Sequence, residues 1–137
     1  PAFDPTVTAN RNMALELHAF LMKEVRPGQR VMVTSQGHMV NPSVLTYLDL
    51  RDRGASPIFD DRYFVDPSPH FSAELAASDF IVASEPGTGT LFDFMPNNKN
   101  EGASPAAVRA APDYRQIAFF PAATGKGYYV FRHERTR

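Results

Sequence analysis

Polar side chains suited to ligand binding follow three apolar runs of this 137-residue sequence, close to the point where each run ends. They are, in chain order, His38 and Asn41, then Asp60 and Asp61, then Glu85 and Thr88. In an open parallel sheet, ligands bind in the crevice beyond the carboxyl ends of the strands. If the three runs are neighbouring strands, these side chains converge on one ligand-binding site. The alternative is that they are ordinary loop residues that serve turns.

Imidazole and carboxylate groups in one place suit acid–base chemistry, yet no catalytic motif accompanies them. Ser35, His38 and Asp60 have the residue types of a hydrolase triad, but the Gly-x-Ser-x-Gly turn that exposes such a serine is missing. Asp60 and Asp61 have the types of an acid–base pair, but neighbouring residues on a strand point to opposite faces. Only one of these carboxylates would enter a shared site. We therefore predict no catalytic residue in this chain.

Metal and cofactor sites are not predicted either. The chain has no cysteine, and no two of its four histidines are spaced as His-x-x-x-His. Residues 87–90, Gly-Thr-Gly-Thr, contain glycines of the kind that let backbone N–H groups approach a phosphate. They lack both the dinucleotide fingerprint and the Gly-Lys-Ser/Thr ending of such loops. We therefore expect no metal, no cofactor, and an ordinary surface loop at this segment.

Aromatic rings are concentrated in the last third of the chain. They are Phe92, Phe94, Tyr114, Phe119, Phe120, Tyr128, Tyr129 and Phe131. On strands whose side chains alternate between two faces, about half of such rings belong to the core. The remaining rings are candidates for a platform that stacks on a sugar or docks another domain or a membrane surface.

Four pairs of a cap-forming residue and a proline mark where helices begin. The Asp, Asn or Ser side chain accepts a hydrogen bond from a first-turn N–H, and proline at the first helical position loses no hydrogen bond. The pairs are Asp4-Pro5, Asn41-Pro42, Ser68-Pro69 and Ser104-Pro105. Because Asn41-Pro42 comes soon after His38, we expect the N-terminus of its helix to face the ligand-binding site. Charged residues 51–53 should point outward in the last turn, and Gly54 should end this helix.

Short β-rich runs lie between these helix starts. The predicted helices cover residues 5–25, 42–53, 69–78 and 106–111, and the predicted strands cover 30–35, 56–59, 80–83, 114–120 and 128–133. This order predicts a three-layer, Rossmann-like α/β domain with a mostly parallel sheet. Gly125 and Gly127 suit a hairpin turn, so the last two strands should form a C-terminal antiparallel hairpin. We expect the polar tail after His133 to be frayed.

The length and composition indicate a single α/β domain over residues 1–137 with a core of its own. Hydrophobic residues make up 43% of the chain and charged residues 21%, which is ordinary for a globular domain. The net charge is −1, so no overall field attracts nucleic acid, and we expect no nucleic-acid partner. No apolar run is long enough to span a membrane, and the first residues lack the pattern of a signal peptide.

Several segments, taken in order, resemble one family. They are the strand and loop from Val31 to His38 running into Asn41-Pro42, then Ser78-Asp79-Phe80-Ile81-Val82 leading to Pro86-Gly87-Thr88-Gly89, then Met95-Pro96-Asn97-Asn98-Lys99, and a closing Tyr129-Val130-Phe131-Arg132. Together they resemble the soluble domain that follows the transmembrane helices in polytopic, lipid-phosphate-sugar-dependent glycosyltransferases. The family is that of the dolichyl-phosphate-mannose and aminoarabinose transferases. The resemblance spans nearly the whole chain.

The resemblance implies a role without catalysis. In that family the catalytic carboxylates and the polyprenyl-phosphate sugar site lie among the transmembrane helices, so no catalytic residue carries over to this chain. It would be an accessory domain of a membrane glycosyltransferase, on the extracytoplasmic side, periplasmic or at the cell surface. Its partners would be the transmembrane portion of the parent protein and a saccharide or lipid-linked sugar. The start at Pro1 rather than Met fits a fragment of a larger membrane protein.

Two other interpretations stay open from the residues themselves. The chain could be a stand-alone small α/β enzyme or ligand-binding module that uses the loops of His38, Asp60 and Glu85 at the carboxyl ends of the strands. If the chain is full length, such a module would be cytoplasmic. It could also be an interaction domain that docks through exposed aromatic side chains.

Overall fold

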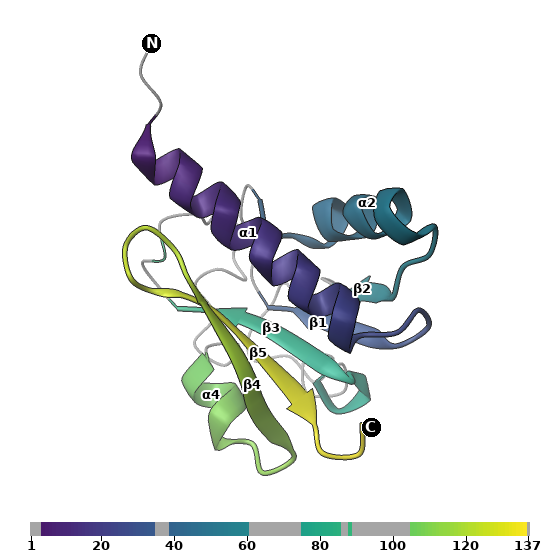
Figure 1. Ribbon diagram of the computed structural model, residues 1–137. Coiled ribbons are helices and arrows are strands. Elements are labelled where there is room, and N and C mark those ends of the chain that lie inside the picture. Colours follow the sequence, from purple (N-terminus) through teal and green to yellow (C-terminus); the bar gives the residue numbers. More distant parts are fainter. Residues whose placement is uncertain (1–3, 35–38, 61–74, 86–87, 89–104, 137) are drawn as a thin grey trace.

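The computed structural model describes residues 4–34, 39–60, 75–85, 88 and 105–136, and within them the chain is an α/β domain with a five-stranded mixed sheet (Figure 1). The elements are α1 (Pro5–Glu24), β1 (Arg30–Val33), α2 (Pro42–Arg53), β2 (Ile58–Asp60), β3 (Phe80–Ser84), α4 (Pro105–Ala110), β4 (Tyr114–Pro121) and β5 (Gly127–His133). Each lies within a few residues of a predicted element. The predicted helix start at Ser68-Pro69 lies outside the described residues, which include a helical turn at 75–77.

Side-chain caps set the starts of the two long helices, as predicted. The Asp4 carboxylate accepts a hydrogen bond from the Thr6 N–H at 2.9 Å, at the start of α1. The Asn41 side chain accepts one from the Val44 N–H at 2.9 Å, at the start of α2. Gly54 ends α2 with a φ of 71°, a left-handed conformation that favours glycine because it has no Cβ.

The strand order is β2-β1-β3-β5-β4. Strands β2, β1 and β3 are parallel neighbours, whereas β5 runs antiparallel to both β3 and β4. The hairpin therefore folds back so that β5 lies between β3 and β4 and leaves β4 at the edge. The predicted α/β class and the C-terminal antiparallel hairpin are confirmed, and the sheet is mixed, with a parallel part formed by β2, β1 and β3.

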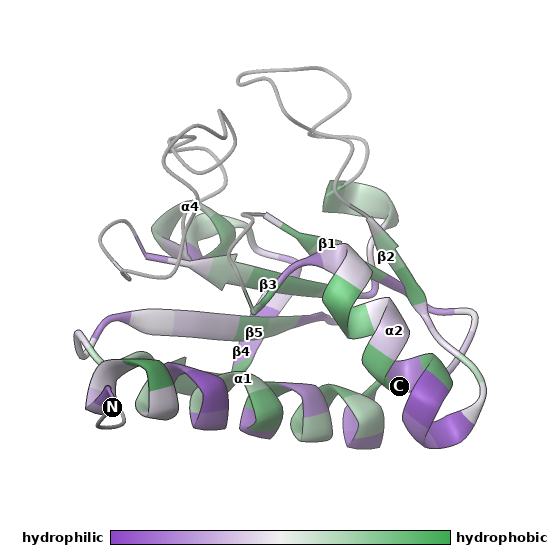
Figure 2. Cartoon of the chain, turned by 90° about the horizontal axis from the view of Figure 1, so that it is seen from above, coloured by the Kyte–Doolittle hydropathy of each residue, from purple (hydrophilic) through white to green (hydrophobic). Residues whose placement is uncertain are grey.

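Side chains of the central strands alternate between two buried clusters, one on each face of the sheet. Val31 and Val33 of β1 pack with α1 and with Leu45 of α2. Met32 points the other way and packs with Val108 of α4. This period of two is typical of strands that are buried on both faces. Figure 2 shows α1 and α4 on opposite sides of the sheet.

The C-terminal tail is held in place, so the prediction of a frayed end is wrong for the described residues up to Thr136. The Arg135 guanidinium donates hydrogen bonds to the carbonyl oxygens of Ala76 and Ser78, at 2.8 and 3.0 Å. Thr136 donates its N–H to His133 and its hydroxyl to Asp79. A polar tail can be ordered when its side chains satisfy carbonyl groups at the end of a helical turn.

Candidate functional site

The carboxyl ends of β2, β1 and β3 lie at one edge of the sheet, because these strands are parallel neighbours. In the register, Met32 of β1 is opposite Asp60 of β2, and Val33 is opposite Val82 of β3. We call this the carboxyl edge and define it by the strand ends at Val33, Asp60 and Ser84. The predicted ligand-binding residues follow these ends.

Three of the predicted ligand-binding residues are described with their side chains. They are Asn41, Glu85 and Thr88. Asp60 is described by its backbone, which forms the last residue of β2. His38 and Asp61 lie outside the described residues. The structure therefore brings the backbones of Asp60 and Glu85 to the same edge of the sheet.

Asn41 serves as the N-cap of α2. Its side-chain oxygen accepts the Val44 N–H, and its carbonyl oxygen accepts the Leu45 N–H at 3.0 Å. Because α2 follows β1 through a short connection, this helix begins near the carboxyl edge. The Asn41 carboxamide oxygen is used to start the helix, which is the ordinary role of an asparagine in this position.

Glu85 and Thr88 form a turn directly after β3. Both the N–H and the hydroxyl of Thr88 donate to the Glu85 carbonyl oxygen, and the Thr88 carbonyl accepts the Thr124 hydroxyl at 3.1 Å. The Glu85 N–H donates to the Gly127 carbonyl at 3.1 Å. These bonds fasten the end of β3 to the β4–β5 hairpin. Thr88 is 1% exposed, so its hydroxyl serves this turn rather than the surface.

The Glu85 carboxylate points to Tyr129 of β5. Tyr129 donates its hydroxyl hydrogen to Oε1 of Glu85. This hydrogen bond is the largest cause of a raised pKa at the Tyr129 phenol, and burial and the negative charge of Glu85 add to it. The phenol is therefore held in its neutral, hydrogen-bonding form.

Two further side chains, those of Arg109 and Phe119, contact the Tyr129 ring, and Gln116 joins them through Arg109. The Arg109 guanidinium of α4 lies over the Tyr129 ring, with Cζ 5.2 Å from the ring centroid, and its Nη2 donates to Oε1 of Gln116 at 3.0 Å. The Phe119 ring of β4 lies 4.6 Å from the Tyr129 ring, centroid to centroid, and is 38% exposed. We call these five residues, Glu85, Arg109, Gln116, Phe119 and Tyr129, the Tyr129 cluster.

The Tyr129 cluster presents groups that are suited to binding a ligand. It contains one carboxylate and one guanidinium, whose charges cancel, together with an amide, a phenol and an exposed ring. A phenol with a raised pKa is a poor nucleophile, because its reactive anion is disfavoured. Over the described ranges of the chain, no group of three His, Asp or Glu side chains is placed to hold a metal ion.

The predicted aromatic set divides between the core and the surface. Tyr128 and Phe131 are fully buried, and Tyr114 is 8% exposed. Phe119 is exposed, and Tyr129 is half-buried beside it. Phe92 and Phe94 lie outside the described residues. Alternation along β4 and β5 therefore leaves rings on the surface, as predicted.

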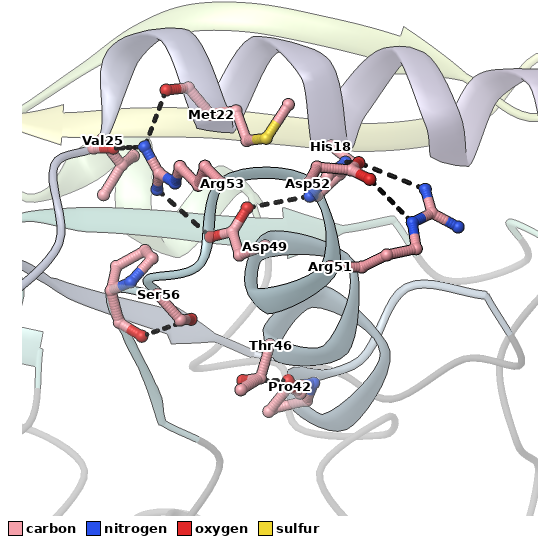
Figure 3. Close-up of polar contacts among 11 residues, drawn as sticks. His18, Met22, Val25, Pro42, Thr46, Asp49, Arg51, Asp52, Arg53 and Ser56 are labelled. Carbon is pink, nitrogen blue, oxygen red and sulfur yellow. Dashed lines mark hydrogen bonds and ion pairs between the residues drawn. The ribbon is translucent and has the colours of Figure 1, made fainter.

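A second polar cluster joins α1 to α2 and was not predicted (Figure 3). His18, 3% exposed, contacts Asp49, 1% exposed, through Nε2 and Oδ1 at 2.8 Å. The other Asp49 oxygen pairs with Nη2 of Arg53 at 3.2 Å. Nη1 of Arg53 donates to the carbonyl oxygens of Met22 and Val25, at 3.0 and 3.1 Å. These carbonyls lie at the C-terminal end of α1, where helical partners run out.

Arg53 corrects the prediction that the charged residues 51–53 all point outward. Its side chain turns back toward α1 and is only partly exposed. Arg51 and Asp52 do lie on the surface, where they pair with each other at 2.7 Å. The four-residue spacing of Asp49 and Arg53 was the one available signal, because such residues are neighbours on a helix. Nothing in the sequence indicated that His18 would be their partner.

Comparison with protein-family models, with curated proteins and with solved structures found no match for this chain. No helix among the described residues combines the length and the apolar character needed to cross a membrane.

Proposed function

We propose that this chain is a non-catalytic accessory domain of a membrane glycosyltransferase that uses a lipid-phosphate sugar donor. It lies on the extracytoplasmic side of the membrane, periplasmic or at the cell surface, next to the transmembrane portion of its parent protein. Its task is to hold a saccharide or lipid-linked sugar at the carboxyl edge. The sequence resemblance supplies the class of enzyme, and the Tyr129 cluster supports a binding role.

The observation that carries the proposal is the position of the Tyr129 cluster. Glu85 follows β3 at the carboxyl edge, and Tyr129 reaches it from β5. Ligands of open α/β sheets bind beyond the carboxyl ends of parallel strands. The cluster offers hydrogen-bonding groups beside an exposed ring, which is the composition of a binding surface. We infer the Rossmann-like character of the fold from the same parallel order, β2-β1-β3, with helices on both faces.

The test is an assay of sugar transfer with the purified chain. The chain is incubated with a polyprenyl-phosphate sugar and candidate acceptors, and product formation is followed by mass spectrometry. We expect no turnover, because the catalytic carboxylates of the resembled family belong to the transmembrane region. Turnover that is lost in a Glu85→Gln variant would overturn the non-catalytic proposal and favour a stand-alone enzyme.

The stand-alone ligand-binding module is a second candidate, favoured by the shared edge of Asp60 and Glu85. It differs from the accessory domain in needing no parent protein. The combined substitution of His38 and Asp60 by Ala tests it. Loss of ligand binding with the fold intact would support the module, and unchanged binding would remove it.

A further inference from the structure

The Tyr129 cluster lies on the face of the sheet that α4 covers. Tyr129 alternates with the buried Tyr128 and Val130, which belong to the cluster on the α1 face. Helix α4 has only 6 residues, so it can cover only a short stretch of this face. Arg109, in the last turn of α4, spans the remaining distance to the Tyr129 ring. The Phe119 side chain of β4 stays 38% exposed.

The polar groups of the cluster are planar and present donors and acceptors in pairs. Glu85 uses Oε1 for Tyr129, and Gln116 uses Oε1 for Arg109. Contacts within the described part of the chain therefore leave Oε2 of Glu85 and the amide nitrogen of Gln116 available for a ligand. A carboxylate and an amide are groups that hydrogen-bond hydroxyls well. A ligand with several hydroxyl groups matches them.

The charges of the cluster give no net attraction for an ionic ligand. Glu85 contributes one negative charge and Arg109 one positive charge, so the two together are neutral. Arg109 already contacts Gln116 and the Tyr129 ring, so an anionic group placed against Oε2 of Glu85 would meet a negative charge there. The exposed Phe119 ring adds an apolar surface next to these groups.

We infer that the Tyr129 cluster binds a neutral pyranose. One apolar C–H face of the sugar packs on the Phe119 ring, and its hydroxyls hydrogen-bond Glu85 and Gln116. Arg109 and Tyr129 act as positioning residues, because they fix the carboxylate and the amide through their own hydrogen bonds. This inference rests on the proposed function. It adds that the cluster holds the sugar ring of the ligand and not its lipid phosphate.

The test is a titration of the chain with methyl mannoside and methyl glucoside, followed by saturation-transfer NMR and by shifts of the backbone amide signals. We expect dissociation constants on the order of 1 mM, a range typical of small ligands with few contacts. Shifts should be concentrated at the Tyr129 cluster. Mannosyl phosphate, used as the anionic probe, should bind more weakly. Absence of binding by both neutral sugars at several times this concentration would overturn the inference.

Two variants separate a sugar platform from a structural contact. Phe119→Ala should weaken binding by about tenfold, because it removes the ring on which the sugar packs. Tyr47→Ala is the matched control, because Tyr47 is an aromatic residue of α2 that is 64% exposed and far from the cluster in sequence. It should bind like the wild type. Equal affinity of the Phe119→Ala variant and the wild type would contradict the inference, provided that circular dichroism shows both folded.

Failure of this inference and failure of the proposed accessory role can be told apart. Sugar binding by a chain whose gene encodes no membrane segments would support this inference while removing the proposed parent protein. If the parent protein is membrane-bound but the isolated domain does not bind neutral sugars, the accessory role is supported and this inference is overturned.

Discussion

The hydroxyl of Tyr129 reports directly on its contact with Glu85. Because the hydrogen bond to Glu85 is the main cause of its raised pKa, Glu85→Gln should lower the pKa of Tyr129 toward the ordinary value. The measurement is an ultraviolet titration of the phenols, with Tyr129→Phe used to identify the signal. An unchanged Tyr129 pKa in the Glu85→Gln variant would show that the two side chains are not in contact in solution.

Tyr114 should make the folded state sensitive to alkaline pH. Its side chain is buried against the carbonyl oxygens of Leu75 and Ser78, and burial raises its pKa from 10.0 to about 12. Between pH 10 and pH 12, the Tyr114 phenol loses its proton in the unfolded chain and keeps it in the folded chain. The stabilisation is therefore complete below pH 10 and lost as the pH rises to 12. Urea unfolding across this range should show that loss.

The Tyr114→Phe variant is the control for the alkaline effect. It lacks the ionisable hydroxyl, so its free energy of unfolding should fall less between pH 10 and 12 than that of the wild type. Parallel losses in the two proteins would assign the effect to other groups.

Asp49 is the residue on which the α1–α2 contact depends most. Asp49→Asn removes the charge that Arg53 and His18 face, and it leaves the guanidinium without a buried counter-charge. Breaking a buried pair in this way costs about 3 kcal/mol. Chemical denaturation measures the change.

Asp52→Asn, on the same helix, should cost clearly less, because the Asp52 side chain is 31% exposed, pairs with the exposed Arg51 and lies 4.0 Å from His18. Similar losses for both variants would contradict a buried network.

At the scale of elements, the hairpin depends on close backbone contact at Gly127. A Cβ on this residue would clash with the carbonyl oxygen of Phe120 and would lie 2.8 Å from Cα of Pro121. Gly127→Ala should therefore destabilise the protein by about 2 kcal/mol, through displacement of β4 from β5.

Gly54→Ala provides the comparison for Gly127→Ala. No atom lies within 4 Å of the Cβ that this substitution adds, so its cost comes only from the left-handed backbone and should be about 1 kcal/mol. Thermal unfolding of both variants measures the two losses of stability, and Gly127→Ala should show the larger one. A greater loss for Gly54→Ala would contradict the close approach of β4 and β5.

Element positions were largely predictable because local chemistry determines them. Caps such as Asn41 and the stop at Gly54 act within one turn of helix. The continuous apolar runs of β1 and β3 indicate burial on both faces without any knowledge of partners. The position of β5 between β3 and β4 could not be predicted in this way, because the local sequence does not show which further strand a hairpin pairs with.

The contacts between elements were much less predictable. His18 and Asp49 are 31 residues apart, and their pairing depends on how α1 packs on α2. Glu85 was selected for its place after a strand, but its contact with Tyr129, 44 residues away, required the sheet order. Sequence patterns therefore identified the edge of the candidate site and, in Phe119 and Tyr129, two of its rings, but they missed Arg109 and Gln116, which join the cluster through contacts between elements.

At the scale of the whole molecule, the sheet separates the proposed binding site from the α1–α2 network. The α1–α2 network holds one face together, while the opposite face presents the Tyr129 cluster. A net charge of −1 gives the molecule no strong field of its own. The proposed recognition of a neutral sugar therefore rests on the Tyr129 cluster itself.

The central claim is that this chain is part of a membrane glycosyltransferase. The most direct measurement is an immunoblot of membrane and soluble fractions from the source cells, with an antibody raised against the purified chain. We predict a polypeptide much larger than 137 residues, retained in membranes after a high-salt wash and released by detergent. A soluble polypeptide of the size of this chain would contradict the claim.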